Sequence, residues 1–164
     1  MMVRLSTRLF LAVCLLMGAL TPGGLARAEE SLVWTGKASE GFVSLAYGPL
    51  DPAKTPLFLL SCFNAMSIAV LDVHKEIEGA KPGEALTIEL SAGDAKSSVE
   101  GESARDDASG VTFGEATDLA VKPVLEVLRQ SGPLTVTMGK TSANFSDQGR
   151  TQAVDIFSQN CELD

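Results

Sequence analysis

Residues 57–73 read LFLLSCFNAMSIAVLDV, and this stretch decides the fold. Residues 57–63 form a nearly unbroken apolar run, which predicts a strand buried on both faces. After a tight connection at residues 64–65, apolar side chains recur at every second position and predict a returning strand over residues 66–73. The stretch therefore predicts a β-hairpin at the centre of a sheet.

Further short segments around this hairpin show the alternation or the turn-bounded length that is typical of strands. They are residues 32–36, 41–47, 86–90, 95–100, 111–115, 134–138 and 142–146. Turn-forming residues separate them, such as the Gly-Pro-Leu-Asp-Pro run at residues 48–52. Residues 101–110 are polar, and we expect them to form an exposed loop or hairpin tip.

The hydrophobic period changes in two places and predicts two short helices. Residues 121–128 place apolar side chains at helical spacing, with Asp118 or Thr117 as a candidate cap and Pro123 within the first turn. Gly132-Pro133 ends this helix.

The second helix is predicted after Asp147, where positions with helical spacing form one stripe. They are Arg150, Ala153, Val154, Phe157 and Cys161. The patterns together predict an α+β fold, with a mostly antiparallel β-sheet or sandwich and two short helices that cover one face.

The first 28 residues have the features of a secretory signal peptide. A basic start precedes an apolar run over residues 9–20, and Ala26-Arg27-Ala28 has the small-x-small pattern of a cleavage site. The alternatives are an uncleaved anchor, for which the run is short, and a lipoprotein at Cys14. Cleavage after Ala28 predicts a single periplasmic or secreted domain over residues 29–164, without membrane insertion.

The expected mature chain is strongly acidic. Removing residues 1–28 discards three of the 13 basic residues and none of the 21 acidic ones, which leaves ten basic residues and a net charge of −11. Binding of nucleic acid or anionic lipid needs a basic face, so this balance argues against both. It suits a partner with a basic patch, and equally a protein that is merely soluble.

Cys62 and Cys161 are the cysteines that remain after cleavage. In an oxidising compartment, two cysteines predict a disulfide. A metal pair or a redox pair is the alternative, but there is no Cys-x-x-Cys spacing and His74 is the single histidine. A bridge of this span would stabilise the fold by about 4 kcal/mol if the entropy of the unfolded chain dominates.

Several segments resemble small exported accessory proteins encoded with type VI secretion clusters. The resemblance is carried by residues 59–62, the helix over 121–128, the strand over 134–138, and residues 143–146 leading into the helix with Cys161. It spans roughly residues 57–163. It implies the same fold and cysteine pairing, and a role beside a secretion system.

Two places carry residues suited to chemistry. His74 lies among charged neighbours without a nucleophile motif, so we expect a solvated turn histidine rather than a catalytic base. Asp106 and Asp107 could offer oxygen ligands to calcium, but their spacing lacks the pattern of an EF-hand loop, and an acidic hairpin tip is the expectation. We expect no cofactor, since the glycines are scattered through turns.

These observations favour a non-enzymatic periplasmic accessory or binding protein whose partner is another envelope protein, such as a component of a secretion system. The alternative is a small peptidoglycan hydrolase or an inhibitor of one, which would depend on His74 or on the pair Asp106 and Asp107. A purely structural protein without a dedicated ligand is a third hypothesis. Its only sensitive feature would be the disulfide.

Overall fold

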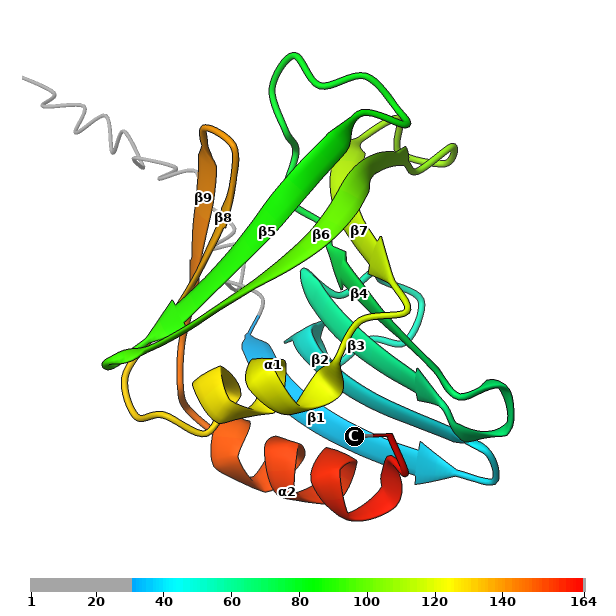
Figure 1. Cartoon of the computed structure of the whole chain (residues 1–164), viewed down its shortest axis with the longest axis vertical. Helices are drawn as coiled ribbons and strands as arrows, with labels where there is room; N and C mark the ends of the chain where they lie inside the picture. Colours follow the sequence, from blue (N-terminus) through cyan, green and yellow to red (C-terminus); the bar gives the residue numbers. More distant parts are fainter. Residues whose placement is uncertain (1–30, 164) are drawn as a thin grey trace, which may run out of the picture.

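A computed structural model describes residues 31–163 of the chain (Figure 1). This part of the chain contains nine strands, two α-helices and one 3-10 turn. The strands are β1 Leu32–Ser39, β2 Phe42–Pro49, β3 Phe58–Phe63, β4 Ile68–Val73, β5 Ala85–Ala92, β6 Ala95–Arg105, β7 Thr112–Thr117, β8 Leu134–Met138 and β9 Thr141–Phe145. The helices are α1 Val121–Leu128 and α2 Arg150–Asn160, and the 3-10 turn is Asn64–Met66.

The strands form one continuous sheet in the order β1-β2-β3-β4-β7-β6-β5-β8-β9, and all of its pairings are antiparallel. The expected antiparallel α+β fold is confirmed, as a single sheet rather than a sandwich. Figure 1 shows the sheet curling, with both helices together at its lower end. None of the helices among residues 31–163 is long and apolar enough to cross a bilayer.

The curled sheet encloses one hydrophobic core, to which both helices contribute buried side chains. Aromatic rings connect the last strand with the first three. The ring of Phe145 in β9 lies 5.3 Å from that of Tyr47 and 6.1 Å from that of Phe58. The indole nitrogen of Trp34 donates a hydrogen bond of 2.5 Å to the carbonyl of Ser146. Side chains therefore bring the two ends of the sheet together across the core.

Helix α2 lies against β1 and β2, and a glycine permits this close packing. A Cβ atom at Gly36 would stand 2.6 Å from the carbonyl oxygen of Ala153 and 2.9 Å from the Cβ of Ile156. No side chain fits in that space without moving the helix, because these distances are well below van der Waals contact. Packing against α2 therefore requires glycine at position 36.

Arg150 clamps the start of α2 to the end of α1. Its side chain is 1% exposed. Its Nε donates to the carbonyl of Leu128 at 2.9 Å, and its Nη2 donates to those of Gly132 at 2.8 Å and Gln130 at 2.5 Å. These oxygens belong to the last turn of α1 and the segment after it, which lack partners within the helix. The guanidinium group thereby caps α1 from another element.

The central hairpin, β3 and β4, is confirmed. In β4 the core face carries Ala69, Leu71 and Val73, so the outer face carries the alternate residues. The expectation that β3 is buried on both faces holds only in part, because Leu59 and Phe63 are half-buried on the outer face.

Two expectations about the secondary structure are wrong. Residues 101–105 are not a loop but continue β6, which pairs with β7 as far as Arg105. Ser103 is buried there, and its hydroxyl bonds to the carbonyls of Lys81 and Glu84. Neither proposed residue caps α1: its N-cap is Ala120, which makes no side-chain capping bond, and Asp118 instead takes a left-handed backbone conformation with φ of 57°. The predicted signal peptide, with Cys14, lies outside the described residues.

Candidate functional site

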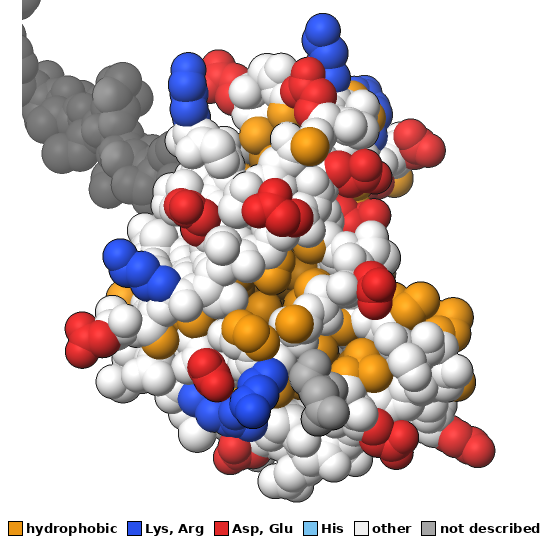
Figure 2. Space-filling view, in the orientation of Figure 1, with side chains coloured by type: hydrophobic (Ala, Val, Ile, Leu, Met, Phe, Trp, Pro, Cys, Tyr) orange, Lys and Arg blue, Asp and Glu red, His pale blue; other side chains and the backbone are white. Residues whose placement is uncertain are grey.

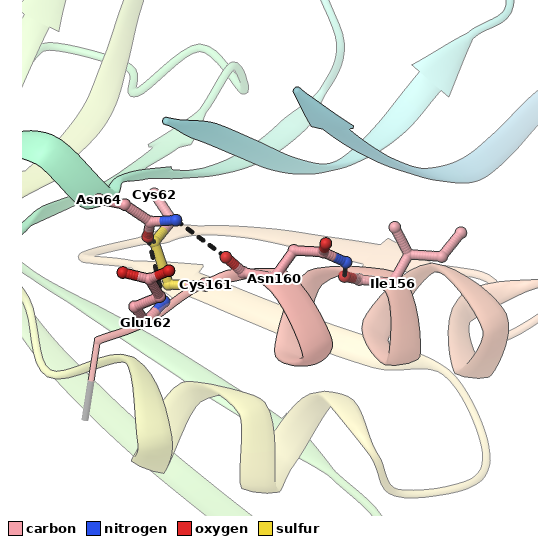
Figure 3. Close-up of a disulfide and its surroundings, with 6 residues drawn as sticks. All are labelled: Cys62, Asn64, Ile156, Asn160, Cys161 and Glu162. Atoms are coloured by element: carbon pink, nitrogen blue, oxygen red, sulfur yellow. Dashed lines mark hydrogen bonds between the residues drawn. A yellow bond between two sulfur atoms is a disulfide. The ribbon is translucent and has the colours of Figure 1, made fainter. Parts of the chain in front are cut away.

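A disulfide joins Cys62 in β3 to Cys161 just after α2 (Figure 3), as expected from the cysteine count. The two Cα atoms are 5.9 Å apart, and the bridge closes a sequence separation of 99 residues. Cys62 is fully buried in the core, whereas Cys161 is half-buried at its margin. The bridge attaches the end of the chain to β3, while the helix before it lies over β1 and β2.

Asn64 forms a second attachment beside the disulfide (Figure 3). Its Nδ2 donates to the carbonyl of Asn160 at 2.9 Å, and its Oδ1 accepts from the backbone N–H of Glu162 at 3.0 Å. The same Oδ1 lies 3.0 Å from the sulfur of Cys62, which carries no hydrogen in the disulfide. One amide thus holds the chain on both sides of Cys161.

Three carboxylates lie side by side on the outer face of the sheet, and we call them the acidic row. Asp72 in β4 is opposite Glu115 in β7, and Glu115 is opposite Glu102 in β6. Residues paired in register point to the same face, and neighbouring strands are about 4.8 Å apart. The row therefore places three acids in line across three strands, on the side away from the core.

Asp72 is half-buried within the acidic row. One of its carboxylate oxygens is fully buried and accepts no hydrogen bond from the residues of the structure. Burial, and secondarily the charge of Glu115, raises the pKa of Asp72 to about 6. Such a group is a candidate for function, because a buried carboxylate beside a second acid is costly unless a proton or cation neutralises it.

His74 does not lie free in a turn as we expected, but covers an aromatic side chain. Its ring stacks on Phe113 with centroids 4.2 Å apart. Phe113 is 8% exposed, although it lies on the outer face and outside the core cluster. Burial lowers the pKa of His74, and the nearby Asp106 partly opposes this effect. His74 thus shields Phe113 from solvent on the outer face.

The Asp106 carboxylate is engaged within its own loop. It accepts hydrogen bonds from the N–H of Ala108 at 2.9 Å and from the hydroxyl of Ser109 at 2.7 Å. These bonds lower the pKa of Asp106. Asp107 is exposed beside it. Within residues 31–163, no three His, Cys, Asp or Glu side chains gather in a way that could hold a metal ion.

A hollow of about 240 Å³ lies on the outer face beside the acidic row. Apolar atoms of Ala46 and Leu59 line it from the sheet, and Leu50 and Pro56 line it from the loop between β2 and β3. Lys37, Asp51 and Lys54 also line it. Leu59 is opposite Asp72 in the β3–β4 pairing, so the hollow adjoins the acidic row.

A separate apolar patch lies at the β3–β4 turn. Phe42 and Phe63 pack with ring centroids 5.0 Å apart, and Met66 is 60% exposed. Figure 2 shows hydrophobic side chains gathered at the right of the view, over this turn, and in the middle of the view between β6 and α1. The patch lies far along the hairpin from the acidic row, since Phe63 and Asp72 are at different ends of the β3–β4 register.

Of the residues singled out from sequence, the structure brings His74 near Asp106, and Asp107 is exposed to solvent. The acidic row was missed, because its members lie far apart in sequence. Only Asp72, a charged residue within an apolar strand, offered a local signal. No protein-family model, curated protein or solved structure matches the chain.

Proposed function

We propose that this protein is a non-enzymatic accessory protein of the periplasm that contacts another envelope protein through the outer face of β4, β7 and β6. The observation that carries the proposal is the acidic row: three carboxylates in register on adjacent strands. A component of a secretion system is the partner that the resemblance of residues 57–163 suggests.

The acidic row is energetically unfavourable in the free protein. Like charges directly opposite each other on neighbouring strands destabilise a sheet. Burial is the main cause of the raised pKa of Asp72, and the charge of Glu115 adds to it, which shows that the two carboxylates repel each other. Lysine or arginine side chains of a partner would neutralise the row and form charge-assisted hydrogen bonds with it. The free protein would thus bear a cost that the complex removes.

Crosslinking in the native envelope tests this proposal. A photoreactive residue placed at Thr117, exposed on the outer face of β7, should form a defined crosslinked product. The triple variant Asp72→Asn, Glu115→Gln, Glu102→Gln should lose it. The matched control Glu40→Gln, Asp94→Asn, Glu126→Gln removes the same charge from exposed sites elsewhere and should retain it. Equal products from both triple variants would refute the proposed face.

The alternative of a peptidoglycan hydrolase requires a general acid or base with a free proton-transfer atom. The sequence suggested His74 and Asp106 for this role, and the structure places the two near each other. However, the carboxylate of Asp106 already accepts two hydrogen bonds from its own loop. Turnover of cell-wall substrate that disappears in His74→Ala would support the hydrolase over the accessory protein.

A further inference from the structure

We propose that the outer face recognises an extended segment of its partner in which one apolar residue is followed, at alternate positions, by two lysine or arginine residues. The apolar side chain would enter the hollow at Leu59, and the basic side chains would lie over the acidic row. This inference rests on the proposed function and specifies the chemistry of the partner.

The hollow and the acidic row share one line across the sheet. Ala46 pairs with Leu59, Leu59 with Asp72, Asp72 with Glu115, and Glu115 with Glu102. With strands about 4.8 Å apart, the three acids lie about 5, 10 and 14 Å from Leu59 along this line. Along this line, the apolar hollow therefore comes first and the three negative charges follow it.

An extended chain laid along this line matches the spacing. Its side chains point to the same side at every second residue, about 7 Å apart. With an apolar residue of the segment above Leu59, the residue two positions later lies between Asp72 and Glu115. The residue four positions after the apolar one lies above Glu102. Because β4, β7 and β6 are interior strands, their backbone groups already pair within the sheet. The recognition must therefore use side chains, and binding should be salt-sensitive.

The hollow is held in place before any partner binds. A Cβ atom at Gly48 would stand 2.6 Å from the Cα of Pro56, which shows how closely the loop returns onto β2. The backbone N–H of Leu57 donates to the carbonyl of Tyr47 at 2.8 Å, and Asp51 accepts from the N–H of Ala53 at 3.0 Å. A rigid wall loses little conformational entropy on binding.

The charges at the hollow set the direction of the segment. Lys37, exposed on the edge strand β1, lines the hollow on the side away from the acidic row. Its positive charge disfavours a basic residue there and favours one over β4, β7 and β6. The three acids lie in a row rather than around a point, and the described residues hold no cluster that fits a metal ion. The observations thus favour basic side chains over a divalent cation.

Nuclear magnetic resonance on the mature protein with a blocked synthetic peptide tests the inference. The probe has the sequence Ser-Leu-Ser-Lys-Ser-Lys-Ser, and two control peptides replace its leucine by serine or both lysines by glutamate. The probe should shift the amide signals of Leu59, Asp72 and Glu115. Both control peptides should bind at least about tenfold more weakly, a difference of about 1.4 kcal/mol.

Protein variants separate the two parts of the site. Leu50, whose side chain is 70% exposed, lines the hollow. Leu50→Ser should weaken binding of the probe peptide but leave binding of the serine-substituted peptide unchanged. The triple variant of the acidic row should abolish the preference for lysine, and the matched triple variant at Glu40, Asp94 and Glu126 should keep it. Shifts that map to another face, or equal binding of the probe and its controls, would overturn the inference. If crosslinking still depends on the acidic row in that case, the proposed function stands and only the segment pattern fails.

Discussion

Asp72 and Glu115 lie directly opposite each other on the antiparallel strands β4 and β7, with their carboxylates on the same face. Burial raises the pKa of Asp72 more than the charge of Glu115 does, and the two effects together raise it to about 6. The fold therefore binds a proton at Asp72 more tightly than the unfolded chain, whose aspartate has an ordinary pKa of 3.8. By linkage, this pair makes folding stability depend on pH.

The variant Asp72→Asn should be more stable than the wild type at pH 7. The folded-state pKa lies above the unfolded value, so the contribution of protonated Asp72 is fully present below pH 3.8 and is lost as the pH rises through about 6. The side chain is partly exposed, which reduces the full linkage energy, and we expect a gain of about 1–2 kcal/mol. Urea denaturation at pH 3.5 and pH 7 measures it.

Glu115→Gln serves as the matched control for this pH dependence. It removes the charge opposite Asp72 and should lower the pKa of Asp72 only partly, because burial is the larger cause. Glu126→Gln, on the exposed face of α1, should leave that pKa unchanged. If Asp72→Asn gives the same gain at both pH values, the titration of Asp72 does not explain its effect.

His74 should titrate below its usual pKa of 6.5, because burial against Phe113 disfavours the charged imidazolium. Since the folded-state pKa is lowered, stability should fall as the pH drops below 6.5. Asp106→Asn should lower the pKa of His74 further, because the Asp106 carboxylate raises it. The single imidazole gives an isolated proton signal for this titration. An equal effect of Asp107→Asn would contradict the specific role of Asp106.

Much of the fold follows from local patterns, but the acidic row does not. The hairpin of β3 and β4 could be predicted because a nearly unbroken apolar run is followed directly in sequence by an alternating one. The length of β6 could not, since Ser103 is buried through hydrogen bonds to residues near Lys81 rather than through apolar contact. The row depends on β7 lying between β4 and β6, and strand order of this kind leaves no local signal.

Loss of the disulfide should destabilise the protein by about 4–5 kcal/mol, as expected for a loop of roughly 100 residues. Cys161→Ser, compared with the wild type in urea, measures this loss. Asn64 should then matter more, because it holds the backbone at Asn160 and Glu162 without the bridge. Asn64→Ala should increase hydrogen exchange at the end of the chain strongly in Cys161→Ser and little in the oxidised protein. Equal increases in both backgrounds would refute this shared role.

Arg150→Met should destabilise the protein by at least about 3 kcal/mol, because it leaves the carbonyls of Leu128, Gln130 and Gly132 without their donors. Arg129→Met is the matched control, since Arg129 is exposed, and its effect should stay within about 0.5 kcal/mol.

The guanidinium carbon of Arg150 lies 5.9 Å from the centre of the Trp34 ring, so the fluorescence of this single tryptophan should change in Arg150→Met alone. Arg150→Lys keeps the charge but lacks the forked donors, and it should recover less than half of the lost stability because an ammonium group cannot reach all three oxygens. Full recovery by lysine would show that charge beside Trp34, rather than the three carbonyl bonds, holds α2 against α1.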